Sequence, residues 1–343
     1  MTDNIYMERA LLLASHGLLS CAPNPMVGAV VVGPDGRILG EGYHIRTGEG
    51  HAEVNALNAV KKEDWPLLPE STIYVSLEPC AHYGKTPPCA ALIVKRRLKR
   101  CVIGCIDPFS RVSGKGVEML RQGGVEVDFA PEELRQRCLH LNKRFICQHH
   151  LGRPFITLKW AQTRDGYIGA TDRRLTISTS ESRMFGHRLR ASHQAIVVGH
   201  NTLLQDAPRL DIRHWASGSH RRDEMLGVYI LGRVGEEELP HGWQAFAHID
   251  DLLENMQREG QQSLLVEGGT QVLQSFIERD LWDEAWAEQG TNDALDAEGH
   301  CLPEELLVAA PKMPREFSYD EEIHFGRTFR HWESPLLKEN YGL

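Results

Sequence analysis

The sequence predicts an α/β protein built from two consecutive domains. Its 343 residues are about twice the length of an ordinary domain, so each half can bury a core of its own. Short apolar strands alternate with helices in both halves, which is typical of layered folds with parallel strand pairing. The run CQHHLGRP at residues 147–154 interrupts this alternation with His, Gly and Pro. We therefore expect domains at residues 1–147 and 148–343.

The first domain is expected to begin with a helix from Asp3, a good N-cap, to Gly17, a good helix end. VGAVVVG predicts a buried strand at residues 27–33, and GPDGR predicts a hairpin turn into a returning strand at residues 37–44. A helix is expected to open near His51, where apolar residues recur at helical spacing. Further strands are expected at residues 72–77, 101–105 and 125–129, and further helices at residues 91–98 and 116–124.

The second domain repeats the alternation of strands and helices. Strands are expected at residues 155–161, 195–199, 227–232 and 263–269, and helices at residues 181–191, 249–257 and 270–278. The acidic stretch at residues 291–305 fits neither pattern, so we expect a loop there.

Composition narrows the class of protein and its partners. The formal net charge is -9, which disfavours a broad basic surface for nucleic acid. No apolar run approaches the roughly 18 residues of a membrane span, and the polar start MTDNIYMERA does not resemble a secretory signal. We therefore expect a cytoplasmic protein. In that compartment the eight cysteines are expected to bind metal or to be buried rather than to form disulfides.

The most specific pattern is a set of metal ligands beside an acid. His51 is followed two residues later by Glu53, and Pro79-Cys80 is followed by Cys89. One imidazole and two thiolates suit one Zn²⁺ per chain and leave a fourth position for water, whose pKa zinc lowers to about 7. Glu53 is expected to be the catalytic residue, moving a proton from that water to a leaving amine.

This pattern is similar to the signature of zinc nucleobase deaminases, in which H-x-E is followed by P-C-x-x-C. The chain departs from it, because eight residues (AHYGKTPP) separate the two cysteines. Two other interpretations stay open. One is a closed structural zinc site with His82 as fourth ligand, and the other is a deaminase of free nucleosides or of tRNA, which the acidic composition disfavours.

Longer motifs resemble the bifunctional deaminase/reductase family of riboflavin biosynthesis over nearly the whole chain. The first half contains PNPMVG, GEGYH, HAEVNAL and LEPCAHYGKTPPC in that order, and the second contains LKWAQTRDG, LRASHQAIVVGHNTLLQDAPRLDIR and VEGGTQVLQSF. The resemblance implies a cytidine-deaminase-like three-layer domain followed by a dihydrofolate-reductase-like α/β domain. It also implies deamination of a phosphoribosylated diaminopyrimidine, then NADPH-dependent reduction of its ribose to a ribityl chain, in a homo-oligomer (dimer or tetramer).

The resemblance also implies roles for individual residues. Contacts to the deaminase substrate fall on Asn24, His44, His82 and Lys85. Contacts to the reductase substrate fall on Lys159, Arg174, Arg190, Leu210, Arg213 and Glu267. Contacts to NADPH fall on Ala161, Thr176, Thr202, Asp206, Gly268 and Gly269. The glycine pair follows a strand and precedes a helix, where backbone amides can hold a pyrophosphate, and Arg190 and Arg213 are expected to grip the ribose phosphate.

The second half departs from the family pattern at three places. Thr176 stands where the family commonly has Trp, and Arg174 stands where a small hydroxyl residue is usual. The tail after Trp286 lacks the usual apolar strand and Gly-rich closing segment. An active deaminase whose C-terminal domain has lost reductase activity is therefore the alternative function.

Overall fold

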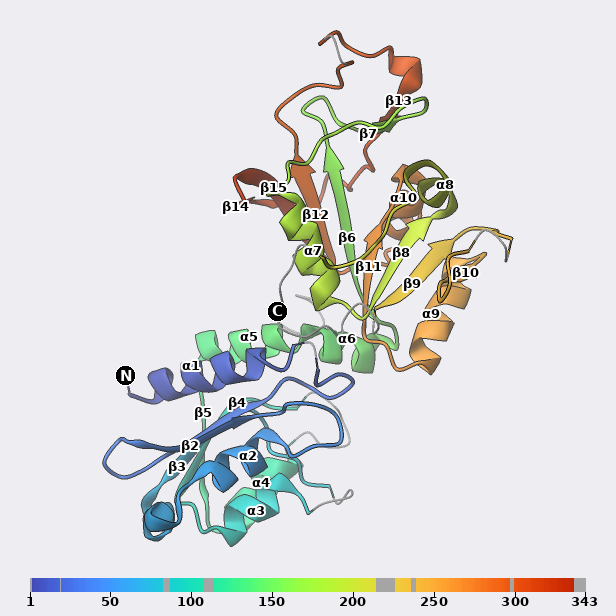
Figure 1. The fold of residues 1–343 in the computed structure, drawn as a ribbon. Helices are drawn as coiled ribbons and strands as arrows, with labels where there is room; N and C mark the ends of the chain where they lie inside the picture. The colour runs from blue at the N-terminus through green and yellow to red at the C-terminus, as the bar shows by residue number, and fades with distance from the viewer. Residues whose placement is uncertain are drawn as a thin grey trace. The chain divides into compact units, whose positions relative to one another are not determined.

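The computed structural model of the chain is a mixed α/β structure with two large sheets, each in a separate compact unit, and a two-stranded sheet in the second unit (Figure 1). It describes residues 2–18, 20–82, 87–107, 114–213, 226–235, 239–296 and 299–335. The units meet in sequence between Gly152 and Arg153. Among the described helices, none has the length and apolarity needed to cross a bilayer.

The first unit contains a five-stranded sheet in the order β2-β1-β3-β4-β5. The strands are β1 (Gly28–Val32), β2 (Ile38–Tyr43), β3 (Thr72–Leu77), β4 (Arg100–Cys105) and β5 (Glu126–Phe129). The predicted hairpin joins β1 to β2, so β1 runs antiparallel to both its neighbours. The neighbours β3, β4 and β5 are parallel, as predicted. The prediction of parallel pairing was wrong for β1 and β3, which are antiparallel.

Helices cover both faces of this sheet and make the predicted three layers. They are α1 (Thr2–Ser15), α2 (Ala52–Ala59), α3 (Cys89–Lys95), α4 (Lys115–Gln122), α5 (Glu132–Leu141) and α6 (Lys143–Leu151), with the 3₁₀ helix η1 (Lys62–Glu70). Side chains alternate along each strand, so Val31 belongs to the core cluster that includes residues of α2, α3 and α4, whereas Val30 belongs to the cluster that includes residues of α1 and α5. Figure 1 shows α2, α3 and α4 on one face of the sheet and α1 and α5 on the other.

Two glycines of the GEGYH motif fix the position of α2 on the sheet. A Cβ at Gly40 would lie 2.3 Å from the Ala56 carbonyl oxygen, and a Cβ at Gly42 would lie 2.4 Å from the Ala56 nitrogen. The helix backbone therefore rests directly on β2, which sets where its first turn, following His51, lies.

The sequence did not predict α5 and α6. Only two of the nine residues of α6 are buried, Ile146 and Cys147, so its apolar periodicity is weak. The helix continues past Cys147 to Leu151, through the residues whose composition we interpreted as a break in the pattern.

The second unit contains an eight-stranded sheet in the order β10-β9-β8-β11-β6-β12-β15-β14. The strands are β6 (Phe155–Gln162), β8 (Ala195–Gly199), β9 (Gly227–Leu231), β10 (Gln244–Phe246), β11 (Ser263–Glu267), β12 (Glu284–Gln289), β14 (Asp320–His324) and β15 (Arg327–Glu333). Neighbours from β10 to β12 are parallel, and β15 and β14 close the sheet antiparallel. The helices are α7 (Arg183–Ser192), α8 (His200–Asp206), α9 (Ile249–Arg258) and α10 (Thr270–Glu278).

The tail after Trp286 does supply strands, so the expectation from sequence was wrong there. β15 places Phe329 and Trp332 in the core between charged neighbours, and Trp332 stacks on Trp160 with ring centroids 5.7 Å apart. The expected loop at residues 291–305 contains an isolated bridge between Leu295 and Cys301 and the 3₁₀ turn η3 (Glu304–Leu306). Beyond it, β13 (Leu307–Ala309) pairs with β7 (Tyr167–Ala170) in a separate small sheet.

A buried ion pair joins the start of β6 to the start of β12. The Asp283 carboxylate is fully buried, and it accepts hydrogen bonds from the Arg153 guanidinium at 2.6 and 3.0 Å. The same carboxylate accepts the Ile156 backbone N–H at 2.8 Å. Because removal of one partner leaves the other charge buried, this pair is a point where the second unit can be destabilised selectively.

Asp283→Asn should lower the free energy of unfolding of the second unit by about 3–5 kcal/mol, because the Arg153 charge loses its counterion. Denaturant unfolding followed by tryptophan fluorescence, to which the buried Trp160, Trp282, Trp286 and Trp332 of the second unit contribute, measures the change. The control is Arg164→Ala, which removes an exposed pair with Asp293 and should leave the unfolding curve close to that of the wild type. Equal shifts for the two variants would contradict the prediction.

Candidate functional site

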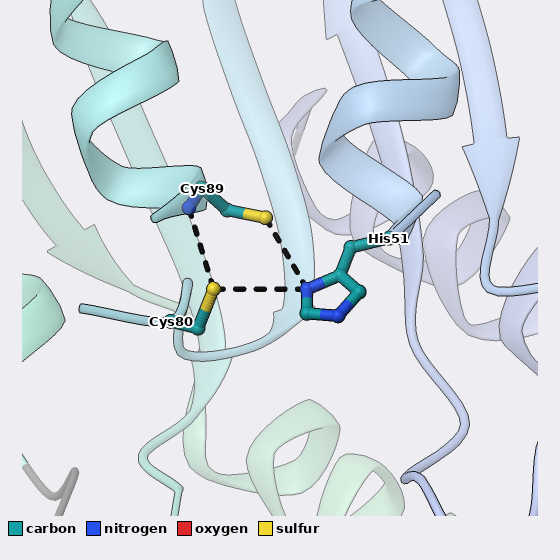
Figure 2. A group of neighbouring side chains, drawn as sticks. All are labelled: His51, Cys80 and Cys89. Carbon is teal, nitrogen blue, oxygen red and sulfur yellow. Dashed lines mark hydrogen bonds between the residues drawn. The ribbon is translucent and has the colours of Figure 1, made fainter. Parts of the chain in front are cut away.

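His51, Cys80 and Cys89 converge in the first unit, although they come from three separate elements (Figure 2). His51 is the N-cap of α2, Cys80 follows β3, and Cys89 is the first residue of α3. Their donor atoms all lie within 4.8 Å of one another. The Nδ1 atom of His51 is 3.6 Å from the Cys80 sulfur and 3.4 Å from the Cys89 sulfur.

This donor set fits a zinc ion. Sulfur and imidazole nitrogen are the ligands zinc prefers, and three protein ligands leave one tetrahedral position for water or substrate. The contact between the two thiols lowers the pKa of Cys80 to about 4 and raises the pKa of Cys89, so one negative charge is already favoured at the centre. His82, the fourth ligand of the alternative closed site, is exposed and does not belong to the group.

Glu53 lies in the first turn of α2, directly beyond the ligand His51. Its side chain is buried, with 3% of the residue exposed. Burial, helped by the negative charge of Cys80, raises the pKa of Glu53 to about 7. A carboxyl group with a pKa near neutrality can both accept and release a proton, as general acid–base catalysis requires.

Asn24 and His44 form a hydrogen-bonded pair beside these ligands. The His44 ring lies edge-on to the His51 ring at 5.4 Å, and its Nδ1–H donates to the Gly50 carbonyl at 3.1 Å. Burial lowers the pKa of His44, so the ring is neutral and its Nε2 accepts a hydrogen bond from the Asn24 amide at 3.0 Å. The remaining N–H and the carbonyl oxygen of Asn24 are left for a ligand. Lys85 lies outside the described residues.

A cavity of about 710 Å³ lies in the second unit, a size ordinary for a small-molecule site. All the residues that the sequence associates with reductase substrate and cofactor line it. They are Lys159, Arg174, Arg190, Leu210, Arg213, Glu267, Ala161, Thr176, Thr202, Asp206, Gly268 and Gly269. The glycine pair stands between β11 and α10, with Gly269 as the N-cap of the helix.

The two arginines expected to grip a phosphate are already engaged by carboxylates. Arg190 donates to Glu267 at 2.5 Å and to the Asp211 carbonyl at 3.2 Å. Arg213 is paired with the Asp211 carboxylate. A bidentate grip on phosphate by Arg190 therefore requires that its guanidinium first leave Glu267, which the sequence did not reveal. The contact of Arg213 with Asp211 occupies one terminal nitrogen, Nη1.

Glu267 is the centre of a charged cluster at the end of β11. Burial raises its pKa, but the positive charges of Arg190 and Lys159 outweigh burial, so the pKa of Glu267 lies below its ordinary value. A Cβ at Gly186 of α7 would lie 3.6 Å from the Glu267 carboxylate and 3.8 Å from the Lys159 nitrogen. A side chain at this position would therefore be in van der Waals contact with both charged groups, so α7 passes close to them.

Two further carboxylates escaped the sequence analysis. Glu288 on β12 is fully buried and accepts hydrogen bonds from Ser178 and Ser182, both at 2.5 Å. Ser178 lines the cavity, so Glu288 supports the cavity wall from behind. Glu78 is buried next to the cysteine ligand loop. Glu78 stands within the motif LEPCAHYGKTPPC, but its role could not be inferred there, and no motif contains Glu288; the partners of both residues lie far away in sequence.

Both halves of the chain match known protein families. Residues 1–105 match the model of the cytidine and deoxycytidylate deaminase zinc-binding region, and residues 154–287 match the RibD C-terminal domain. The riboflavin biosynthesis protein RibD of Aquifex aeolicus is 37% identical over 310 residues, which cover 82% of this chain and 85% of that protein. The chain belongs to the RibD family. The RibD protein of Bacillus amyloliquefaciens is 35% identical, over 82% of each chain.

Solved structures of RibD proteins share both units. A Thermotoga maritima structure described as a diaminohydroxyphosphoribosylaminopyrimidine deaminase/5-amino-6-(5-phosphoribosylamino)uracil reductase gives a TM-score of 0.80 at 32% identity, over 97% of this chain and 98% of that one. Acinetobacter baumannii RibD gives a TM-score of 0.80 at 27% identity, with the same coverage. The predicted family, the two predicted fold types, the two enzyme classes and the cofactors zinc and NADPH are confirmed by RibD membership.

Purified protein should contain about one zinc ion per chain, and Cys89→Ser should remove it, because a hydroxyl is a poor substitute for a thiolate ligand. Metal analysis after dialysis against a weak chelator measures the content. Cys301→Ser is the control, since Cys301 is exposed and lies in the other unit. Full zinc content in Cys89→Ser would refute the assignment of this residue as a ligand.

Proposed function

We propose that the first domain, expected at residues 1–147, hydrolyses an amino group from a phosphoribosylated diaminopyrimidine, and that the second domain, expected at residues 148–343, reduces the ribose of the product to a ribityl chain. The convergence of His51, Cys80 and Cys89 beside the buried acid Glu53 carries the first half of this proposal. The cavity at the ends of β6 and β11 carries the second. The printed description of the Thermotoga maritima relative supplies the substrate class.

In the proposed deamination, the oxygen of water forms a bond to the amino-bearing ring carbon. The bond between that carbon and its amino nitrogen breaks, and ammonia leaves. Zinc, when bound by the three ligands, supplies activation of that water. Glu53 accepts a proton as the oxygen attacks and returns a proton to the departing nitrogen, so its carboxyl group ends the cycle unchanged. Asn24 reads the edge of the ring with its free N–H and carbonyl oxygen, held in orientation by His44.

In the proposed reduction, NADPH supplies a hydride to the carbonyl or imine carbon of the opened ribose. Lys159 holds the neighbouring sugar oxygen, beside the negative charge of Glu267, whose pKa the positive charge of Lys159 helps to lower. Arg174 is exposed at the cavity wall and makes no ion pair with any described residue, so it is one of the cations available to the substrate phosphate. Thr202 and Asp206 on α8, with Ala161, Thr176 and the glycine pair, would face the cofactor.

We further propose that the protein works in the cytoplasm as a homo-oligomer, a dimer or a tetramer. All eight cysteines are free thiols, which suits a reducing compartment. The oligomer is proposed from the family resemblance alone, and sedimentation or light scattering of the purified protein tests it.

Glu53→Gln should retain zinc yet lower the rate of ammonia release by about 10²–10⁴-fold, because an amide cannot carry the proton. An ammonia assay with the phosphoribosylated diaminopyrimidine measures the rate. The control is Glu49→Gln, which changes an exposed carboxylate in the loop that precedes α2 and should deaminate normally. Substantial turnover by Glu53→Gln would remove Glu53 from its proposed role.

Lys159→Met should lower NADPH oxidation with the deaminated substrate by about 10²-fold or more, because an oriented charge at the reacting carbon is lost. Ammonia release by the same variant should stay at the wild-type rate, and Lys312→Met, an exposed change in the same unit, should affect neither activity. Absorbance at the NADPH band follows the reaction. If the wild type binds the substrate without oxidising NADPH, the alternative of a C-terminal unit without reductase activity is correct.

A further inference from the structure

Glu78 is a buried carboxylate that binds backbone amides from two segments of the first unit. The residue is 4% exposed and directly follows β3. One oxygen accepts the N–H groups of Gly116 at 2.8 Å and Val117 at 3.3 Å, in the first turn of α4. The other accepts the N–H groups of Gly114 at 3.0 Å and Asp107 at 3.3 Å. Four orphan donors, three of them at a helix start, are thereby satisfied by one side chain.

The two residues after Glu78 are held as closely. A Cβ on Gly116 would lie 2.1 Å from the Pro79 carbonyl oxygen, so the start of α4 packs directly against this peptide. The Cys80 carbonyl accepts the Ala90 N–H at 3.2 Å, and the Cys80 sulfur accepts the Cys89 N–H at 3.3 Å. Glu78, Pro79 and Cys80 therefore tie the starts of α3 and α4 to the end of β3.

The topology explains why this tie matters to the metal ligands. β3 and β4 are parallel neighbours, so the segments that follow them leave the same edge of the sheet. The Glu78 N–H donates to the Cys105 carbonyl at 2.9 Å, which continues the ladder by one step toward Cys80. Cys80 lies two residues beyond this last hydrogen bond of the sheet. The position of its sulfur therefore depends on how the Glu78 carboxylate anchors the turn.

We propose that Glu78 is a positioning residue that holds Cys80 at the distance from His51 and Cys89 that a metal ion requires. This inference rests on the zinc site proposed above. Glu78→Gln keeps the shape of the side chain but replaces one acceptor oxygen with an NH₂ group, which then faces two backbone N–H donors. The turn must move to relieve this clash of donors, and the cysteine ligand moves with it. Altered support of a ligand typically costs 10–100-fold in metal affinity.

The test compares zinc retention in full-length wild-type and Glu78→Gln protein. Zinc transfer to a chromophoric chelator should be about tenfold faster or more in the variant, and saturating zinc should restore most of its ammonia release, because Glu53 is intact. Ser71→Ala is the matched control: it removes a buried hydrogen bond, Ser71 Oγ to Leu67 at 2.7 Å, from the opposite end of β3. This control should lower the melting temperature while leaving zinc transfer unchanged.

Each outcome separates the two ideas. Wild-type zinc transfer in Glu78→Gln, or equal acceleration in Ser71→Ala, would overturn the positioning role and leave the proposed function standing. A failure of saturating zinc to restore ammonia release would also overturn it, since the defect would then lie outside metal retention. Absence of zinc from the wild type would instead defeat the proposed function itself.

Discussion

Convergence of one imidazole and two thiols on a single point is the constraint around which the first unit is built. The three side chains come from the start of α2, the end of β3 and the start of α3. A shift of any one of these elements would separate its side chain from the other two donor groups. Gly40 and Gly42 let α2 lie directly on the sheet, which sets His51. The Glu78 carboxylate anchors the turn that sets Cys80. The metal centre is thus an outcome of backbone packing several residues away from the ligands.

Glu53 shows how the same packing supplies the chemistry as well as the geometry. The turn of α2 that delivers His51 to the metal also places a carboxyl group two residues on, inside the protein. Burial then moves its pKa to about 7, where a carboxyl group can act in both directions. The proposed ligand His51 and the proposed proton carrier Glu53, spaced by two residues, therefore need only one helix start to be positioned together.

Residues whose meaning is local could be predicted from the sequence, and residues whose partners are distant could not. H-x-E, Pro-Cys and GPDGR each encode their role within a few positions, so the ligand set and the hairpin were accessible. Glu78 binds amides 29 to 39 positions later, and Arg190 meets Glu267 across 77 positions, so nothing beside them in the chain marks these pairs. β14 and β15 were missed for a related reason, because their few buried side chains stand between charged residues.

Cations predominate in the lining of the cavity of the second unit, although the chain as a whole is negatively charged. The net charge is -9, yet seven Lys and Arg side chains line the second cavity against three Asp and Glu side chains. Three of the seven, Arg173, Arg190 and Arg213, are held by carboxylates. Lys159 and Arg174 are among those that remain at the wall. The positive charges that line the cavity attract a small phosphorylated ligand, whereas the negative net charge of the chain repels a long polyanion. The cations of the lining therefore suit a nucleotide-sized phosphorylated ligand, and the negative net charge of the chain disfavours nucleic acid.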